Sequence, residues 1–436
     1  MKADLNIPEI TGVSAFVFML AAGAVFLSEI KKIKISVLLI FSVSVIIRLV
    51  FLNSEPSLSD DIHRYVFDGK ILLSSMNPYS DSPLRAADLY PGMKNLASRV
   101  NHPDLVTIYP PAAQLVFAAG AFIGGMNGIR LLIILLDSLS ILVMIRIAMK
   151  AEIPSSRIIL YAWNPLVVME TASSGHIDSA AVFFLILSIY MLTACAPDKE
   201  SRQIYFASAL RFFAAGVAFT FSFLIKLLPV IFLPICLIYA GYKKSMIFIS
   251  GFIAAVILLV VPFLPDIQNV LKTLDVYARN WEFSGFIFRE LRQTTGNGNM
   301  ARIVIMAVFA LFALGIYGQA FQKKTSNGFD AKSFFRSIYI LCLVFLLLTP
   351  TLHPWYAVYL ASIFPFVPGA SGICMTFAVL LSYRVLIPYR LTGQWTESDL
   401  VAMLIFAAPV VASSANFLMK AIFYRDSACK HRKLTS

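Results

Sequence analysis

Long apolar runs, separated by short connections rich in Lys and Arg, are the feature that most constrains the fold of this chain. A helix of about 20 apolar residues crosses the hydrocarbon core of a bilayer. Because backbone polar groups in hydrocarbon must pair within their own segment, and because these runs do not alternate in polarity, helices are expected rather than barrel strands. Only 14% of the 436 residues are charged and 59% are hydrophobic, too little polar surface for a soluble fold of this size. The sequence therefore predicts an all-α, polytopic transmembrane helical bundle.

The basic residues predict the orientation of this bundle. Lys and Arg are enriched in cytoplasmic connections. Placing the clusters around Lys31, Lys243, Lys323 and residues 420–433 in the cytoplasm gives about thirteen spans, with the N-terminus outside. These basic residues stand between apolar runs and form no continuous patch, so the net charge of +12 does not indicate a nucleic-acid partner.

Two long external connections are expected in what we predict to be a single membrane domain, residues 1–436. The first covers about residues 54–127 and the second about residues 265–300. Within the first, the apolar stretch at about 111–125 is roughly five residues too short to cross the membrane. If it crossed, Arg146 and Lys150 would fall outside, so the charge rule favours an interfacial or re-entrant helix.

Residue types that are rare elsewhere gather in the predicted external connections. Four of the five histidines and three of the four tryptophans lie there. The segments are SDDIHRY (59–65), NHPDLVTIYPP (101–111), SSGHID (173–178), YARNWEFSG (277–285), TPTLHPWY (349–356) and YRLTGQW (389–395). This clustering predicts one external site and suits an enzyme better than a channel.

An acidic pair, Asp60 and Asp61, directly follows the second predicted span. A partly desolvated carboxylate there could act as a general base. The alternative is a helix cap, in which Ser59 or Asp60 accepts from backbone N–H groups of the helix that follows. The neighbouring His63 and Arg64 bring more ionisable chemistry than a cap requires, and they favour a functional role.

Ionisable residues also lie within or beside an apolar span at about residues 158–174. Because a charge inside a membrane is costly, Glu170 suggests a role in a protein-facing cavity. The alternative is a purely structural kink at Pro165, satisfied by Asn164. His176 and Asp178, at the external end of this span, are expected to face the same cavity.

Cationic and aromatic residues on the same side complete the candidate site. Lys226 is suited to binding a phosphate, although it could instead snorkel to the interface. His353 and Tyr356 belong to an aromatic rim that could equally be an interfacial belt, and His102 could be an ordinary surface residue. The remaining candidates are Arg64, Tyr109, Arg279, Arg384 and Arg390.

Metal binding stays open at this level. Asp60, Asp61, Asp104 and Asp178 offer carboxylates, but their spacing matches no recognised metal signature. A divalent metal is possible, and no other cofactor is indicated.

Taken in order, these segments resemble the GT-C superfamily of membrane glycosyltransferases, especially the bacterial polyprenyl-phosphate-mannose-dependent mannosyltransferases. The resemblance spans most of the chain. It rests on SDDIHRYVFDGKILLSSMNPY from residue 59, NHPDLVTIYPPAAQ from 101, YAWNPLVVMETASSGHID from 161, KLLP from 226, ARNWEFSG from 278 and HPWY from 353. It implies that Asp60 or Asp61 is the catalytic base in the first large external loop. It also implies a multi-pass protein of the bacterial inner membrane whose site faces outward.

The chemistry implied by the resemblance is transfer of a sugar, possibly mannose, from a polyprenyl-phosphate carrier to an acceptor hydroxyl. The acceptor could be a glycan, a lipid or a protein. Lys226, Arg64, Arg279 and His102 would stabilise charge on the departing phosphate. A direct, one-step displacement would invert the anomeric centre.

Two other classes of protein fit the composition. A transporter or lipid flippase would have as many helices, but such proteins tend to place broken helices at the midplane and to show paired repeats. A non-catalytic scaffold subunit would not need a concentrated set of acids, bases and cations.

Overall fold

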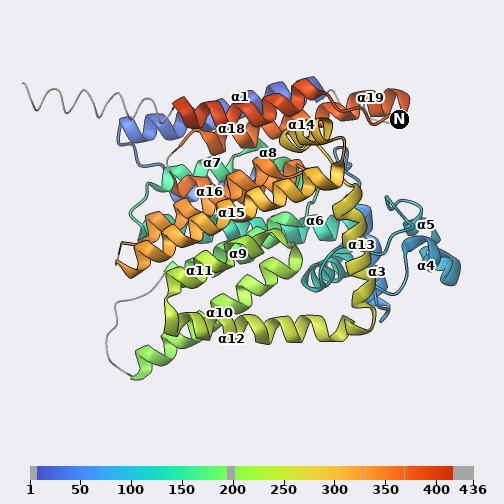
Figure 1. The fold of residues 1–436 in the computed structure, drawn as a ribbon, viewed down its shortest axis with the longest axis horizontal. Coiled ribbons are helices and arrows are strands. Elements are labelled where there is room, and N and C mark those ends of the chain that lie inside the picture. The colour runs from blue at the N-terminus through green and yellow to red at the C-terminus, as the bar shows by residue number, and fades with distance from the viewer. Residues whose placement is uncertain (1–6, 194–201, 327, 368, 416–436) are drawn as a thin grey trace, which may run out of the picture.

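Helices that run side by side along one direction make up the computed structural model of the protein (Figure 1). It describes residues 7–193, 202–326, 328–367 and 369–415; the basic cluster at 420–433 lies outside these ranges. The α-helices are α1 (Ile7–Ile30), α2 (Val37–Val50), α3 (Asp61–Leu73), α4 (Pro83–Leu89), α5 (Lys94–Ala97), α6 (Pro111–Lys150), α7 (Ile159–Ala162), α8 (Pro165–Val168), α9 (Asp178–Thr193), α10 (Arg202–Ile225), α11 (Leu233–Ala240), α12 (Tyr242–Val260), α13 (Ile267–Asn280), α14 (Phe286–Thr295), α15 (Gly298–Thr325), α16 (Ala331–Leu348), α17 (Ala357–Ile363), α18 (Ser371–Ala378) and α19 (Leu386–Thr392).

Short helical turns of other types connect or extend these helices. Met169–Ser173 is a π-helix. The 3₁₀ turns are Pro91–Met93, Ser155–Ile158, Leu228–Phe232, Val261–Asp266, Pro354–Tyr356, Phe364–Phe366 and Val379–Val385. Two isolated β-bridges join Phe283 and Ser284 to Thr351.

The predicted all-α polytopic fold is confirmed, but fewer helices have full spanning length than the thirteen spans expected. In the described part of the chain, seven helices are long and apolar enough to cross a bilayer. A pair that bends by 117°, Pro165–Ser173 with Asp178–Thr193, counts as an eighth. Other apolar runs form shorter helices: Val37–Val50, Leu228–Ala240 and Asp399–Ala415.

The apolar faces turned away from the bundle suit a lipid surrounding. Leu258 on α12 is 75% exposed and Leu311 on α15 is 71% exposed. Side chains of this kind are rarely left in water in such numbers, whereas lipid tails solvate them.

Helix α6 contains a break that separates its first part from the long span. The backbone leaves helical geometry at Gly124 and Gly125, so residues 111–123 form a short arm before the span resumes. Helix α3 packs against this arm at very close range. A Cβ on Gly69 would lie 2.3 Å from the carbonyl oxygen of Phe117, so only glycine permits this approach.

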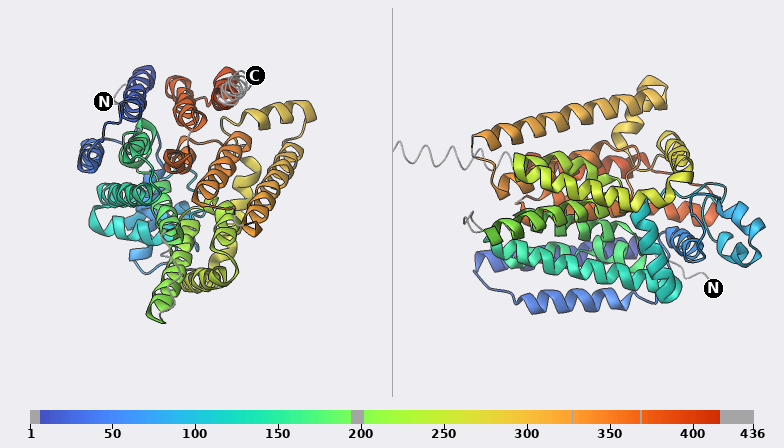
Figure 2. Two further views of the ribbon diagram at one scale, coloured as in Figure 1. Left: turned by 90° about the vertical axis from the view of Figure 1, so that its left-hand side faces the viewer. Right: turned by 90° about the horizontal axis from the view of Figure 1, so that it is seen from below.

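One end of the bundle carries the long connections. Residues 51–110 and 261–297, with α3, α4, α5, α13 and α14, lie together at the right of Figure 1, and Figure 2 shows the same grouping from below. Helix α13 runs across the ends of the long helices at this end. We call this part of the molecule the loop end.

A charged network lies inside the bundle. Arg48 of α2 pairs with Asp137 of α6, with 2.5 Å between Nε and Oδ2, and both side chains are fully buried. The hydroxyl of Tyr161 donates to the same carboxylate, and Arg48 also donates to Ser44 Oγ and to the carbonyl of Ala162. This network ties three segments together, because a buried charge must be paired to be tolerated.

Candidate active site

The acidic pair lies where α3 begins. Asp60 is at the N-cap position, but its side chain makes no capping hydrogen bond. Its Oδ1 accepts instead from the Asn101 side chain at 2.9 Å. Ser59 Oγ accepts from the backbone N–H of Asp61 at 3.3 Å. Of the two residues considered as a helix cap, Ser59 therefore makes a contact of this kind and Asp60 does not.

Asp61 points into the protein more than Asp60 does. Its side chain is 21% exposed. Tyr109 donates its hydroxyl to Asp61 Oδ2 at 3.3 Å, and Asn101 donates to Oδ1 at 3.2 Å. Burial raises the pKa of Asp61 above its usual value; Lys226 lowers it, and the charge of Asp60 raises it again. A carboxylate with a raised pKa is suited to accept a proton near neutral pH.

Lys226 directly follows α10 and turns into the same cluster. Its Nζ lies 3.4 Å from Asp178 Oδ2, and its side chain is only 17% exposed. The ammonium also lies over two rings, 5.3 Å from the centroid of Tyr109 and 5.5 Å from that of Tyr356. Such contacts hold a cation within a site rather than at the membrane interface.

The segment between α8 and α9 supplies the deepest acid. Glu170, in the π-helix, is fully buried and accepts from the Tyr383 hydroxyl at 2.6 Å. Asn164, whose side chain accepts from Leu166 N–H at 3.0 Å, caps the helix that starts at Pro165. Asn164 therefore performs the structural role at this kink, and Glu170 takes no part in it.

His176 lies between the two acids. Its Nδ1 is 3.8 Å from Asp61 Oδ2, and its Nε2 is 3.4 Å from Glu170 Oε2. Its ring stacks on Trp355 with 3.9 Å between centroids. The loop end thus brings together residues from α3, from the turn before α9, from the end of α10 and from the 353–356 turn.

An aromatic wall closes one side of this cluster. Trp355 stacks on His353 at 4.3 Å as well as on His176, and the hydroxyls of Tyr356 and Tyr277 are 3.0 Å apart. Burial and the nearby Lys226 lower the pKa of His353 to about 3, so this imidazole is neutral. His353 and Tyr356 therefore face the site, as expected if they form its rim.

Other residues singled out from the sequence occupy different places. Arg64 donates to the backbone carbonyls of Asn101, His102 and Leu105, so it positions that loop. The ring of His102 packs edge-on against Trp281 at 4.7 Å.

The remaining arginines also lie elsewhere. Arg279 is 66% exposed and pairs with Asp275 at 2.8 Å. Arg384 is exposed, and Arg390 donates to the carbonyl of Ser57. Among the cationic residues predicted for the site, Lys226 is the one that lies close to Asp61 and Asp178.

Several residues of the cluster were not among the residues predicted for the site. Asn101 and Tyr277 belong to the predicted external segments, but neutral polar and aromatic residues are common at a membrane interface. Trp355 was predicted as part of the aromatic rim, together with His353 and Tyr356. Tyr383 lies in an apolar stretch far along the chain, and nothing local marks it as the partner of Glu170.

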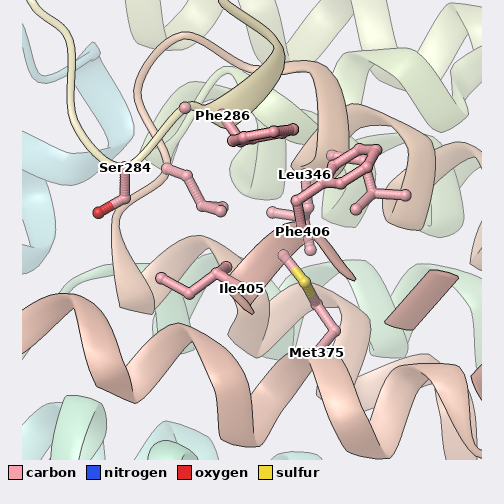
Figure 3. A pocket seen from close by; sticks show the side chains of 9 residues that line it. Ser284, Phe286, Leu346, Met375, Ile405 and Phe406 are labelled. Carbon is pink, nitrogen blue, oxygen red and sulfur yellow. The ribbon is translucent and has the colours of Figure 1, made fainter. Parts of the chain in front are cut away.

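Two cavities of the described structure lie outside this cluster. One, lined mainly by apolar side chains of α16, α18 and the 405–406 segment, measures about 10 Å³ (Figure 3), roughly the room needed by one water molecule. A second, of about 200 Å³, lies between α3 and α4 and is lined by Asn77, Ser80, Asp81 and Tyr90 among others. In the described ranges, no group of three or more His, Cys, Asp or Glu side chains is arranged to hold a metal ion.

A polytopic helical bundle that gathers several acids and an ammonium at one end defines a multi-pass membrane protein with a candidate active site. Residues 13–241 match the MptA_B family, described as alpha-(1->6)-mannopyranosyltransferase, N-terminal domain. The match covers more than half of the chain, and the chain belongs to this family. No curated protein and no solved structure gives a match. Because the family is one of mannosyltransferases, the match favours an enzyme over a transporter, a flippase or a scaffold.

The matched part contains Asp60, Asp61, Glu170, His176 and Lys226. The aromatic wall at 353–356 and Tyr383 lie beyond it. The charged residues of the cluster thus lie within the matched family domain. The rest of the chain supplies the aromatic residues of the cluster.

Proposed function

We propose that this membrane mannosyltransferase takes its sugar from a polyprenyl-phosphate carrier and transfers it to an acceptor hydroxyl, with Asp61 as the general base. The observation that carries this proposal is that Asp61 and Lys226 both contact Tyr109: Asp61 accepts from its hydroxyl, and the Lys226 ammonium lies over its ring. A base and a cation so arranged suit a displacement in which a proton leaves one oxygen while negative charge develops on another.

In the proposed reaction, Asp61 accepts the proton of the acceptor hydroxyl as its oxygen attacks the anomeric carbon. The new carbon–oxygen bond forms as the bond to the phosphate oxygen breaks, and the electron pair leaves with the lipid phosphate. Lys226 stabilises the charge on that phosphate. Because phosphate is already an anion, this leaving group needs no proton from an acid, and direct displacement inverts the anomeric centre.

Asp61 is a better candidate for the base than Asp60. Both carboxylates accept from Asn101, but Asp61 is the one of the two that also lies against Tyr109 and His176. Its raised pKa also brings it closer to the working pH, at which a base is most effective. Asp60 lies on the exposed side, where it influences Asp61 through its charge.

The sidedness is part of the proposal. The connection between α1 and α2, which carries Lys31, Lys32 and Lys34, lies at the end of the bundle opposite α3, the helix that begins at Asp61 (Figure 1). By the positive-inside rule, residues 54–127 and 265–300 then face the extracytoplasmic side of a bacterial inner membrane. A lipid carrier reaches such a site within the bilayer, which concentrates and orients it.

The experiment is a transfer assay with membranes that contain the protein. Labelled mannose on polyprenyl phosphate is compared with other polyprenyl-phosphate sugars and with a nucleotide sugar. We expect transfer from a lipid carrier, and a loss of about 10²–10⁴-fold in Asp61→Asn, the usual contribution of a general base. Asp60→Asn is the matched control and should keep most of the activity. Transfer from the nucleotide sugar alone, or full activity in Asp61→Asn, would overturn the proposal.

A further inference from the structure

Three buried polar atoms lie in a row between Asp61 and the interior of the bundle. They are His176 Nδ1, His176 Nε2 and Glu170 Oε2, and none of them has a hydrogen-bond partner within the described structure. Each nevertheless faces a titratable neighbour: 3.8 Å separates Nδ1 from Asp61 Oδ2, and 3.4 Å separates Nε2 from Glu170 Oε2. Buried polar atoms without partners are rare enough to require an explanation.

The backbone of this segment holds the row in place. The π-helix at Met169–Ser173 inserts a wider turn, a feature found frequently at functional sites. Gly175 follows with φ of +70°, and a Cβ there would lie 2.9 Å from Ile62 Cδ1. The N–H of His176 donates to the carbonyl of Glu170 at 2.8 Å. Stacking on Trp355 then fixes the plane of the imidazole ring.

The protons can be assigned from chemistry. Glu170 is fully buried, and no Lys or Arg of the described residues forms an ion pair with it, so its charged form is strongly disfavoured. Its Oε1 already accepts from Tyr383. A neutral imidazole has one donor and one acceptor nitrogen, and its tautomer is set by the partner of the other nitrogen.

A protonated Glu170 therefore donates from Oε2 to His176 Nε2, and this leaves the hydrogen on Nδ1, directed at Asp61. All three atoms in the row then have partners. The two separations, 3.4 and 3.8 Å, are long for hydrogen bonds, as is common in the absence of substrate.

We propose that Glu170 and His176 are positioning residues for the base: neutral Glu170 selects the imidazole tautomer whose Nδ1–H stabilises the carboxylate of Asp61. This inference rests on the proposed function. The proton of the acceptor hydroxyl goes to Asp61 alone, and the hydrogens of His176 and Glu170 stay where they are. After the product leaves, Asp61 returns its proton to water through its exposed side.

Glutamine tests the protonation state of Glu170, because its amide imitates a protonated carboxyl. In Glu170→Gln, the NH₂ group donates to His176 Nε2 and the carbonyl still accepts from Tyr383. We expect Glu170→Gln to keep transfer within about threefold, and Glu170→Leu to lose about 10–100-fold, the usual cost of removing such an indirect partner. Equal losses in the two variants would overturn the inference.

His176→Phe tests the contact with Asp61 and keeps a ring to stack on Trp355. Loss of the Nδ1–H donor raises the pKa of Asp61, so the acidic limb of the pH profile of kcat/KM should move to higher pH. The other groups that face Asp61 are unchanged in this variant: Asp60, Asn101, Tyr109, Asp178 and Lys226. A fall in rate at every pH without movement of the limb would indicate only a structural role and would overturn the inference.

A measurement on the unaltered protein tests the inference even if the variants fail to fold. Solid-state ¹⁵N spectra of histidine-labelled protein in membranes, with His176→Phe used to assign the signal, report the tautomer of His176. We expect the hydrogen on Nδ1, and a hydrogen on Nε2 would overturn the inference. Full transfer in Asp61→Asn would instead overturn the proposed function while leaving this tautomer unaffected.

Discussion

At the scale of single residues, the balance of charges around Asp61 controls its proton affinity. Lys226 lowers the pKa of this carboxylate and Asp60 raises it, on top of the dominant effect of burial. The base acts in its deprotonated form, so activity should rise with pH through the pKa of Asp61. A positive and a negative charge near the base therefore shift the active pH range in opposite directions.

Two substitutions test this balance together. Asp60→Asn removes a raising charge, so the acidic limb of the kcat/KM profile should move to lower pH. Lys226→Met removes the lowering charge, so the limb should move to higher pH. It should also cost about 10²–10³-fold in kcat, because the developing phosphate charge loses its stabilising cation. If the acidic limb moved in the same direction in both variants, this result would contradict the assignment of Asp61 as the base.

The sequence indicated the charged members of the cluster better than the neutral ones. Asp61, Glu170, His176 and Lys226 stand out because an ionisable residue beside an apolar run is expensive. Tyr383 gives no such signal, since a tyrosine within an apolar run is ordinary. Arg64 and Arg279 have the expected charge, but their own neighbours, backbone carbonyls and Asp275, decide where they point.

At the scale of elements, close packing of α3 on the 111–123 arm determines where Asp61 lies relative to Tyr109. Asp61 begins α3, and Tyr109 immediately precedes the arm, so any shift between these two helices moves one residue relative to the other. Gly69 is the contact that sets their separation.

Gly69→Ala should separate these helices. Its Cβ would meet the backbone carbonyl of Phe117, which cannot rotate away, so a destabilisation of about 1–3 kcal/mol is expected, as for other overpacked sites. Transfer should fall as well. Gly92→Ala is the control, because nothing lies within 4 Å of its added Cβ. Equal unfolding temperatures and equal transfer rates in Gly69→Ala and Gly92→Ala would show that the contact between Gly69 and Phe117 is unimportant.

The buried pair of Arg48 and Asp137 gives a second prediction at this scale. Arg48→Met leaves a charged Asp137 without its partner in the bundle and should cost about 3–5 kcal/mol. Arg157→Met is the matched control: its pair with Glu29 is partly exposed, so about 1 kcal/mol or less is expected. Unfolding of the purified variants in detergent measures both, and similar costs would argue against a special role for the interior pair.

The length rule for spans agrees with the break in α6, but it overestimated the number of helices of full spanning length. Both results have one cause. The rule assumes a continuous helix, and it identified residues 111–125 as too short to cross. It could not foresee that the run from Pro165 bends by 117° before α9, or that α2 and α11 are shorter than a full span.

At the scale of the whole molecule, the two ends of the bundle differ in charge, and this difference predicts its sidedness. Single cysteines at exposed positions, in a background without other cysteines, test it directly. Tyr90→Cys lies at the loop end, and Lys243→Cys lies at the opposite end, in the first turn of α12. A membrane-impermeant maleimide should label Tyr90→Cys in intact spheroplasts and Lys243→Cys only after permeabilisation. The reverse pattern would place the site in the cytoplasm.

The family match ends at Gly241, in the turn between α11 and α12. The acids and the ammonium lie before this turn, whereas Trp355, Tyr356 and Tyr383 lie after it and are brought back against them. Residues on both sides of Gly241 thus form the candidate site: the first part of the chain supplies its ionisable groups, and the second part supplies aromatic residues that pack against them. An exchange of residues 242–436 between relatives would therefore change the aromatic surface of the site and leave its ionisable groups as they are.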